Sequence, residues 1–280
     1  MNKLNVKALT EKLNFVATKN LGKVFFAMFL MIMVESLVFG VVVFALVRIS
    51  SVENLTSLYK AVMLGIAFIL STVSFLFQTG LLVLTLKMVR EEFVTIGFVF
   101  YGFRKIKKFL PLALINSLLV SFIFGIYKLI SFLLKPQLKM LEDKFGLVVL
   151  VSIFIGIILL SILFVLVNFI FVTQIKYDNP EMNAFKCFIK SFVLMKGNVF
   201  RFFSFVIRSC GINLVLALFY FGMSLSMNSV KNNFSSILSF VFDFLYFINI
   251  YKAAGRLYFT FPIAYTSLIE NNDSGEVLEA

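Results

Sequence analysis

The sequence contains no histidine, no tryptophan and only two cysteines among its 280 residues. Without histidine the chain cannot build a Ser-His-Asp triad, a histidine general base or an HExxH zinc site. Cys187 and Cys210 are too few for a disulfide scaffold or for a zinc site made of cysteine alone. The GxxxxGK[ST], GxGxxG and GxSxG motifs are also missing. We therefore expect no enzyme, no cofactor and no metal site.

Charge is scarce as well. Charged residues make up 14% of the chain and apolar residues 61%, whereas soluble domains have about 25% and about 45–50%. The adjacent acidic pairs Glu91-Glu92 and Glu142-Asp143 read as solvated loop charges rather than catalytic carboxylates. The composition predicts an integral membrane protein.

Six apolar runs are long enough to cross a bilayer, which takes roughly 20 residues of helix. They cover residues 24–47, 61–86, 109–134, 145–175, 202–227 and 234–251. Because the runs are continuous rather than alternating, they predict helices and not barrel strands. The last run is ambiguous, since Lys252 and Arg256 interrupt an apolar stretch that continues to 269. Either the span ends near Lys252 and the rest lies along the surface, or the span is displaced toward Pro262.

The net charge of +12 predicts orientation rather than nucleic-acid binding, because the basic residues lie between the apolar runs. With six spans, 18 lysines and arginines fall on one side and 7 on the other, with Arg208 inside a span. Cytoplasmic loops collect Lys and Arg, so we expect both termini in the cytoplasm. Residues 270–280 read as a short acidic cytoplasmic tail that follows a single polytopic membrane domain, 1–269.

Three segments that precede odd-numbered spans share an apolar stripe at i, i+3, i+7 and i+10, which is typical of one helix face. The stripes begin at Val6, Phe93 and Phe185. They predict three cytoplasmic-side amphipathic helices in the headgroup layer, each with its apolar face toward lipid and its basic groups toward anionic lipid. The basic residues expected there are Lys12, Lys19, Arg104, Lys105, Lys186, Lys190 and Lys196.

The third of these helices carries the clearest boundary signals. Asp178 or Asn179 can cap it, Pro180 suits its first position and Gly197 can end it. The stripe starts are 87 and 92 residues apart, as expected for three units of interfacial helix plus two-span hairpin, at about 5–86, 92–175 and 180–269. The alternative is that any amphipathic juxtamembrane helix has this pattern.

Three charged residues fall inside predicted spans: Glu35, Arg208 and Asp243. A charge at mid-membrane is costly, so such groups are expected to face the protein interior and pair. Their estimated depths allow a Glu35–Arg208 or an Asp243–Arg208 contact. Such a contact could belong to a proton or ion pathway. It could equally fix helix packing, or the carboxyl could stay protonated and hydrogen-bonded.

One motif precedes the fifth predicted span: it consists of Tyr177-Asp178-Asn179-Pro180, Ala184, Ser191 and Leu194-Met195-Lys196-Gly197-Asn198. It matches a Pro-x-x-x-Ala…Ser…Met-Lys-Gly signature, and by this signature the sequence resembles a bacterial six-span integral membrane family of unknown function. Asn20-Leu21-Gly22, Phe100-Tyr101-Gly102-Phe103-Arg104, and Pro262 with Tyr265 are also similar. The resemblance implies a bacterial cytoplasmic membrane and no particular activity. The charged 252–256 stretch departs from the expected final span.

Together these observations predict an all-α, non-enzymatic membrane protein that engages lipids or a membrane-protein partner. The basic interfacial helices and a hydrophobic groove would make the contacts. The alternative is a secondary transporter that uses Glu35, Arg208 and Asp243.

Overall fold

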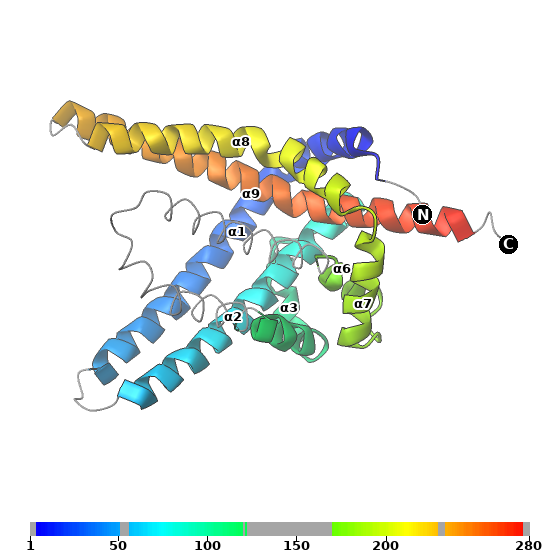
Figure 1. The fold of residues 1–280 in the computed structure, drawn as a ribbon, viewed down its shortest axis with the longest axis horizontal. Helices are drawn as coiled ribbons and strands as arrows, with labels where there is room; N and C mark the ends of the chain where they lie inside the picture. The colour runs from blue at the N-terminus through cyan, green and yellow to red at the C-terminus, as the bar shows by residue number, and fades with distance from the viewer. Residues whose placement is uncertain (1–3, 51–55, 120, 122–169, 229–232, 277–280) are drawn as a thin grey trace, which may run out of the picture. The chain divides into compact units, whose positions relative to one another are not determined.

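The computed structural model describes residues 4–50, 56–119, 121, 170–228 and 233–276. Within these residues all regular structure is helical and no strand occurs (Figure 1). The elements are α1 (Val6–Ser50), α2 (Thr56–Val89), the 3₁₀ helix η1 (Ile96–Phe100), α3 (Tyr101–Arg104), α6 (Val172–Asp178), α7 (Ala184–Met195), α8 (Val199–Asn228) and α9 (Asn233–Glu276). Residues 106–119 are also helical.

Four helical segments are long and apolar enough to span a membrane. They are Val6–Leu37, Phe68–Val89, Val199–Met227 and Ile237–Glu270. They correspond to the first, second, fifth and sixth predicted spans, which supports the assignment to a membrane protein. The predicted spans 109–134 and 145–175 lie largely outside the described residues. The count of six spans therefore stays a prediction.

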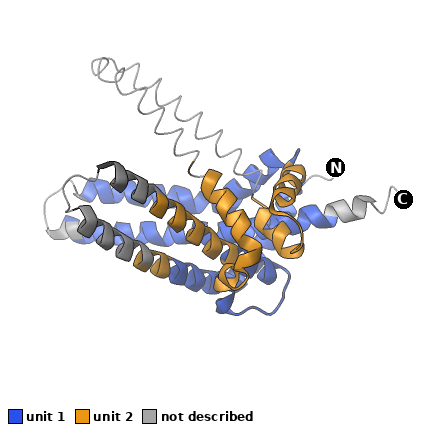
Figure 2. Cartoon of the chain, turned by 90° about the horizontal axis from the view of Figure 1, so that it is seen from below, with its two compact units in different colours: residues 1–31, 81–99, 196–280 blue, residues 32–80, 100–195 orange. Residues whose placement is uncertain are grey.

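The chain divides into two compact units, which are described separately below (Figure 2). Unit 1 consists of residues 1–31, 81–99 and 196–280, and unit 2 of residues 32–80 and 100–195. Each unit gathers stretches that are far apart in the sequence, so the division does not coincide with three sequential repeats.

In unit 1, α8 and α9 pack side by side through small and weakly polar residues (Figure 1). Ala217 and Ala253 are buried. The hydroxyls of Ser224 and Ser239 lie 3.0 Å apart, and the Cys210 thiol donates to the Ala253 carbonyl at 3.3 Å. Small residues let membrane helices approach closely, and hydroxyl pairs join them where water is absent.

Helix α9 is a single helix of 44 residues with Pro262 inside it. Neither predicted arrangement of the last span, an end near Lys252 or a displacement toward Pro262, corresponds to a break in this helix. Residues 270–276 continue α9 as helix, and the expectation of an acidic cytoplasmic tail from residue 270 stays a prediction. Arg256 is not a free cytoplasmic cation, because it donates to the Asn14 amide oxygen of α1.

The N-terminal stripe was expected to form its own helix in the headgroup layer, but α1 runs without a break through 45 residues. Residues 17–23 contain no proline, and Gly22, with open space around it, costs a helix only about 1 kcal/mol. Leu9, Leu13 and Val16 are buried within unit 1. The apolar face of this stripe therefore packs against protein, and the prediction that it faces lipid was wrong.

The second stripe does not form one helix either. Residues 92–95 are not helical, and η1 and α3 follow as short separate turns. Within unit 2, α3 lies so close to α2 that a Cβ added at Gly102 would be 2.2 Å from the Leu76 carbonyl oxygen. Phe77 of α2 packs its ring edge-on against Phe100 and Phe103 at centroid distances of 5.7 and 4.6 Å. This tertiary contact, rather than an amphipathic helix, organises the segment.

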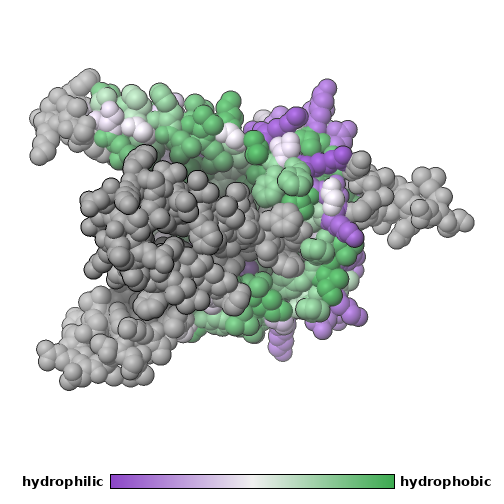
Figure 3. Space-filling view, in the orientation of Figure 1, coloured by the Kyte–Doolittle hydropathy of each residue, from purple (hydrophilic) through white to green (hydrophobic). Residues whose placement is uncertain are grey.

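Large apolar side chains remain exposed along α8 and α9. Ile207, Ile212, Val215 and Leu218 are more than half exposed on α8, as are Phe240 and Phe244 on α9. In Figure 3 the visible side chains along α8 are mainly hydrophobic. Monomeric soluble proteins rarely expose such continuous apolar surface. This face is suited to hydrocarbon.

Candidate functional site

The three charges predicted inside the membrane are divided between the two units. Arg208 and Asp243 belong to unit 1 and Glu35 to unit 2. Arg208 is exposed on α8, Asp243 is half-buried on α9, and the structure of unit 1 contains no ion pair between them. The buried face of α8 includes Ser209 and Cys210, and Arg208 does not belong to that face. The Arg208 side chain is therefore exposed, although its position along α8 would allow a contact with Asp243. The predicted Glu35–Arg208 contact stays a prediction.

Glu35 is half-buried on α1, and its Oε1 is shielded from solvent without a hydrogen-bond partner. A buried oxygen without a partner costs about 1–3 kcal/mol. Among Glu35, Arg208 and Asp243, Glu35 is therefore the residue whose buried polar atom is not accounted for by helix packing.

The seven predicted interfacial basic residues reach the surface. Lys12, Lys19, Arg104, Lys105, Lys186 and Lys196 are exposed, and Lys190 is half-buried. None of the seven forms an ion pair with another described residue. By contrast, Lys108 pairs with Glu181 at 3.0 Å, and this ammonium lowers the pKa of the exposed Glu181 carboxyl.

Helix α7 comes nearest to the predicted interfacial helix. Asn183 precedes it and accepts a hydrogen bond from the Phe185 backbone N–H at 3.3 Å, as an N-cap does. The expected cap at Asp178 or Asn179 and the first position at Pro180 were wrong, because α6 extends through Asp178 and a turn follows. The expected end at Gly197 is close to the observed one, since α7 ends at Met195 and Gly197 has a positive φ of 78°.

The buried face of α7 is fixed to α6. Ala184, Cys187, Ser191, Leu194 and Met195 are buried. The Ser191 hydroxyl oxygen accepts from the Phe171 N–H at 3.2 Å, just ahead of α6. Pro180, Ala184, Ser191 and Met195, which belong to the motif before the fifth predicted span, therefore lie at a structural junction.

The same helix exposes a second apolar surface, formed by Phe185, Ile189, Phe192 and Val193. Phe185 is 67% exposed and Phe192 50%. Lys186, Lys190 and Lys196 accompany this surface. The predicted stripe is thus split: Met195 packs inward, while Phe185 and Phe192 point outward. Helix α7 and the residue that follows it therefore present large apolar groups together with ammonium groups that pair with no other described residue.

Lys176 is a structural residue whose surroundings the sequence does not reveal. It is one of the 18 basic residues expected on the cytoplasmic side, but it is only 8% exposed. Its ammonium donates to the carbonyls of Pro180 and Met182 at 2.8 and 2.6 Å. The cation therefore holds the turn between α6 and α7. The helix pattern of residues 172–178 contains no signal that could have revealed this.

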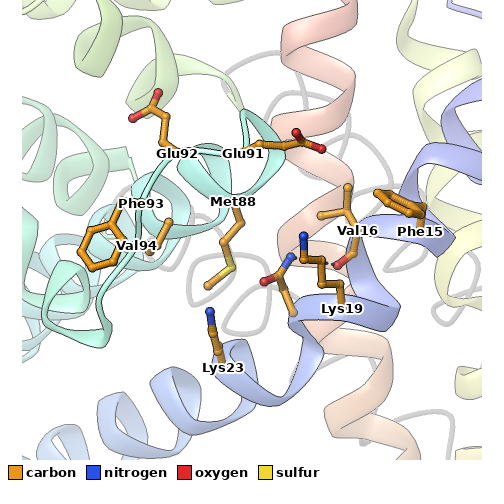
Figure 4. A pocket seen from close by; sticks show the side chains of 10 residues that line it. Phe15, Val16, Lys19, Lys23, Met88, Glu91, Glu92, Phe93 and Val94 are labelled. Carbon is orange, nitrogen blue, oxygen red and sulfur yellow. Dashed lines mark hydrogen bonds between the residues drawn. The ribbon is translucent and has the colours of Figure 1, made fainter.

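A cavity of about 230 Å³ lies within unit 1, between α1 and the end of α2 (Figure 4). Lys19 and Lys23 extend into it from α1, while Met88 and Glu91 close it from the end of α2 and the turn beyond. The lining residues are Phe15, Val16, Lys19, Asn20, Lys23, Met88, Glu91, Glu92, Phe93 and Val94. Glu91 is exposed in a turn, as expected for a solvated loop charge, and it also lines this cavity.

The two cysteines are buried and unpaired. Burial raises the pKa of the Cys187 thiol, which keeps this thiol protonated and a poor nucleophile. Among the described residues no group of three or more cysteines and carboxylates could hold a metal ion. Comparison with protein-family models, with curated proteins and with solved structures finds no significant match.

Proposed function

We propose that this membrane protein binds phospholipids at the polar end of its spans, with α7 lying in the headgroup layer of the cytoplasmic leaflet. The observation that supports this function is the outward surface of α7, where Phe185, Ile189 and Phe192 lie beside Lys186, Lys190 and Lys196. Apolar groups of this kind enter the acyl boundary while lysines attract anionic headgroups. The cytoplasmic termini, the six spans and membership of the resembled bacterial family are parts of the same proposal.

The absence of tryptophan allows a direct test. Phe192→Trp adds a single fluorophore to the exposed face of α7, and Ile212→Trp adds one to the exposed face of α8, about 15 Å along the helix from residue 202. In bilayers of brominated lipid we expect bromine near the glycerol to quench the first variant most strongly. Bromine near the middle of the chain should quench the second. Water-like emission from Phe192→Trp without quenching would contradict the proposal.

The lysines of α7 should select anionic lipid. In mixed bilayers, Lys186→Gln with Lys190→Gln should weaken the preference of Phe192→Trp for brominated phosphatidylglycerol by about 2 kcal/mol, or roughly thirtyfold. The matched control is Lys7→Gln with Lys12→Gln, because these exposed lysines flank a stripe that packs against protein. An equal effect of both pairs would show that α7 has no special part in lipid binding.

A secondary transporter is the second candidate, supported by the shielded and unpartnered Oε1 of Glu35. If Glu35 carries protons, vesicles containing the protein should take up protons under an imposed potential, and Glu35→Gln should abolish the flux. The lipid-binding function predicts no flux above that of empty vesicles from either protein. A pH-sensitive dye trapped in the vesicles measures the difference.

A further inference from the structure

The cavity lined by Lys19, Lys23 and Glu91 lies at the boundary between the apolar segments of α1 and α2 and the charged residues next to them. In α1, residues 24–34 carry no charge and follow directly after Lys23. In α2, the candidate span Phe68–Val89 ends just before Glu91. Residues 24–31 of α1 and 81–89 of α2 belong to unit 1, and the cavity lies where these two stretches end. In a bilayer such a boundary lies at the level of the headgroups.

Opposite charges line this cavity without neutralising one another. Lys19, Lys23 and Glu91 form no ion pair among the described residues. The neighbouring Glu92 is already paired with Lys87, and its carboxylate is directed away from Lys19 and Lys23 (Figure 4). Asn20 uses its Nδ2 to donate to the Val16 carbonyl at 3.2 Å, so its Oδ1 remains as an acceptor. The free groups are two cations and one anion, with an additional neutral acceptor.

Apolar groups flank the charged ones. Met88 and Val16 are buried at the cavity wall. Phe93 is 85% exposed and Phe15 66%, although each lines the same space. A ligand that fits must therefore combine an anion, a cation and an apolar body.

We propose that this cavity binds the headgroup of an ethanolamine phospholipid. Lys19 and Lys23 would hold the phosphate diester, Glu91 and the Asn20 oxygen would accept hydrogen bonds from the primary ammonium, and Phe15 and Phe93 would contact the acyl chains. A choline headgroup carries the same charges but has no N–H to donate. A glycerol headgroup has no cation to offset Glu91. The inference rests on the proposed function only in placing this end of the spans among headgroups.

The test uses Phe93→Trp as a reporter within the cavity. In mixed bilayers, brominated phosphatidylethanolamine should quench this tryptophan in preference to the phosphatidylcholine or phosphatidylglycerol analogue. Because a charged hydrogen bond distinguishes ethanolamine from choline, we expect a preference of roughly tenfold. Glu91→Gln should remove this preference. Lys19→Gln with Lys23→Gln should weaken binding of both zwitterionic lipids.

Glu11→Gln is the matched control, because Glu11 is an exposed carboxylate of α1 that does not line the cavity. It should leave the preference unchanged. Soluble glycerophosphoethanolamine, added as a competitor, separates a lipid site from a site for the free headgroup: at equal concentration it should displace less than a tenth of the lipid. Three results would overturn the inference. The soluble headgroup could displace all of the lipid, the wild-type protein could show no preference for phosphatidylethanolamine, or Glu91→Gln could keep the wild-type preference. If the cavity showed no ethanolamine preference but Phe192→Trp were still quenched by bromine near the glycerol, this inference would fail and the proposed function would be retained.

Discussion

Replacing Gly102 by alanine is expected to destabilise unit 2 more than any other conservative change. The new Cβ would lie 2.2 Å from the Leu76 carbonyl oxygen. This oxygen is a backbone atom, and the backbone of residue 102 fixes the position of the Cβ, so neither atom can rotate aside. Overpacking costs about 1–3 kcal/mol where side chains can yield, so we expect about 3 kcal/mol or more here. The buried Cys187 of unit 2 provides the measurement, since a thiol-reactive dye in detergent reports the temperature at which this thiol becomes accessible.

Gly222→Ala is the matched control for this substitution. Gly222 lies within α8, and an added Cβ would meet nothing within 4 Å. Alanine at an exposed helical position gains up to about 1 kcal/mol over glycine, so the control should unfold at the same temperature or slightly higher. If both variants unfolded with the wild type, α3 would not approach α2 as closely as the structure indicates.

Replacing Lys176 by methionine is expected to open the turn between α6 and α7. The variant keeps most of the packing but loses the two hydrogen bonds to Pro180 and Met182. Each hydrogen bond from a charged donor contributes about 1.5–3 kcal/mol, so we expect a loss of about 3 kcal/mol, confined at first to this junction. Cys187 lies on α7 with its Sγ 4.0 Å from the Met182 carbonyl oxygen, so its maleimide labelling in the native protein should accelerate.

Two comparisons make the Lys176 result specific. Labelling of Cys210, which is buried against α9 in unit 1, should not change. Lys186→Met removes an exposed lysine of α7 and should alter stability by less than about 0.5 kcal/mol. If Cys187 were labelled at the wild-type rate in Lys176→Met, the buried ammonium would have no part in holding the turn.

Hydropathy identified the helices of this protein more reliably than their ends or faces. Spans predicted at 61–86 and 202–227 correspond to Phe68–Val89 and Val199–Met227. The ends were less predictable, because α1 and α9 continue far beyond any single crossing. No local signal marks where a helix leaves the bilayer if its backbone hydrogen bonds continue unbroken.

The stripes show why the site could be predicted only in part. Those beginning at Val6 and Phe185 have the same spacing, yet Leu13 is buried in protein and Phe185 is exposed. Periodicity establishes that a helix has an apolar face but does not say whether protein or lipid covers it. The cavity at Lys19, Lys23 and Glu91 has the same limit, because its two sides are some 70 residues apart in the sequence.

The residues alone determined that this chain forms apolar helices long enough to cross a membrane. Lipid offers no hydrogen bonds, so apolar runs of this length must satisfy their backbone internally, and that is a local property. Tertiary structure alone decided that Lys176 is buried, that Gly102 must lack a side chain, and that Lys23 and Glu91 share a cavity. Those outcomes depend on which distant surfaces meet, and no local pattern encodes that.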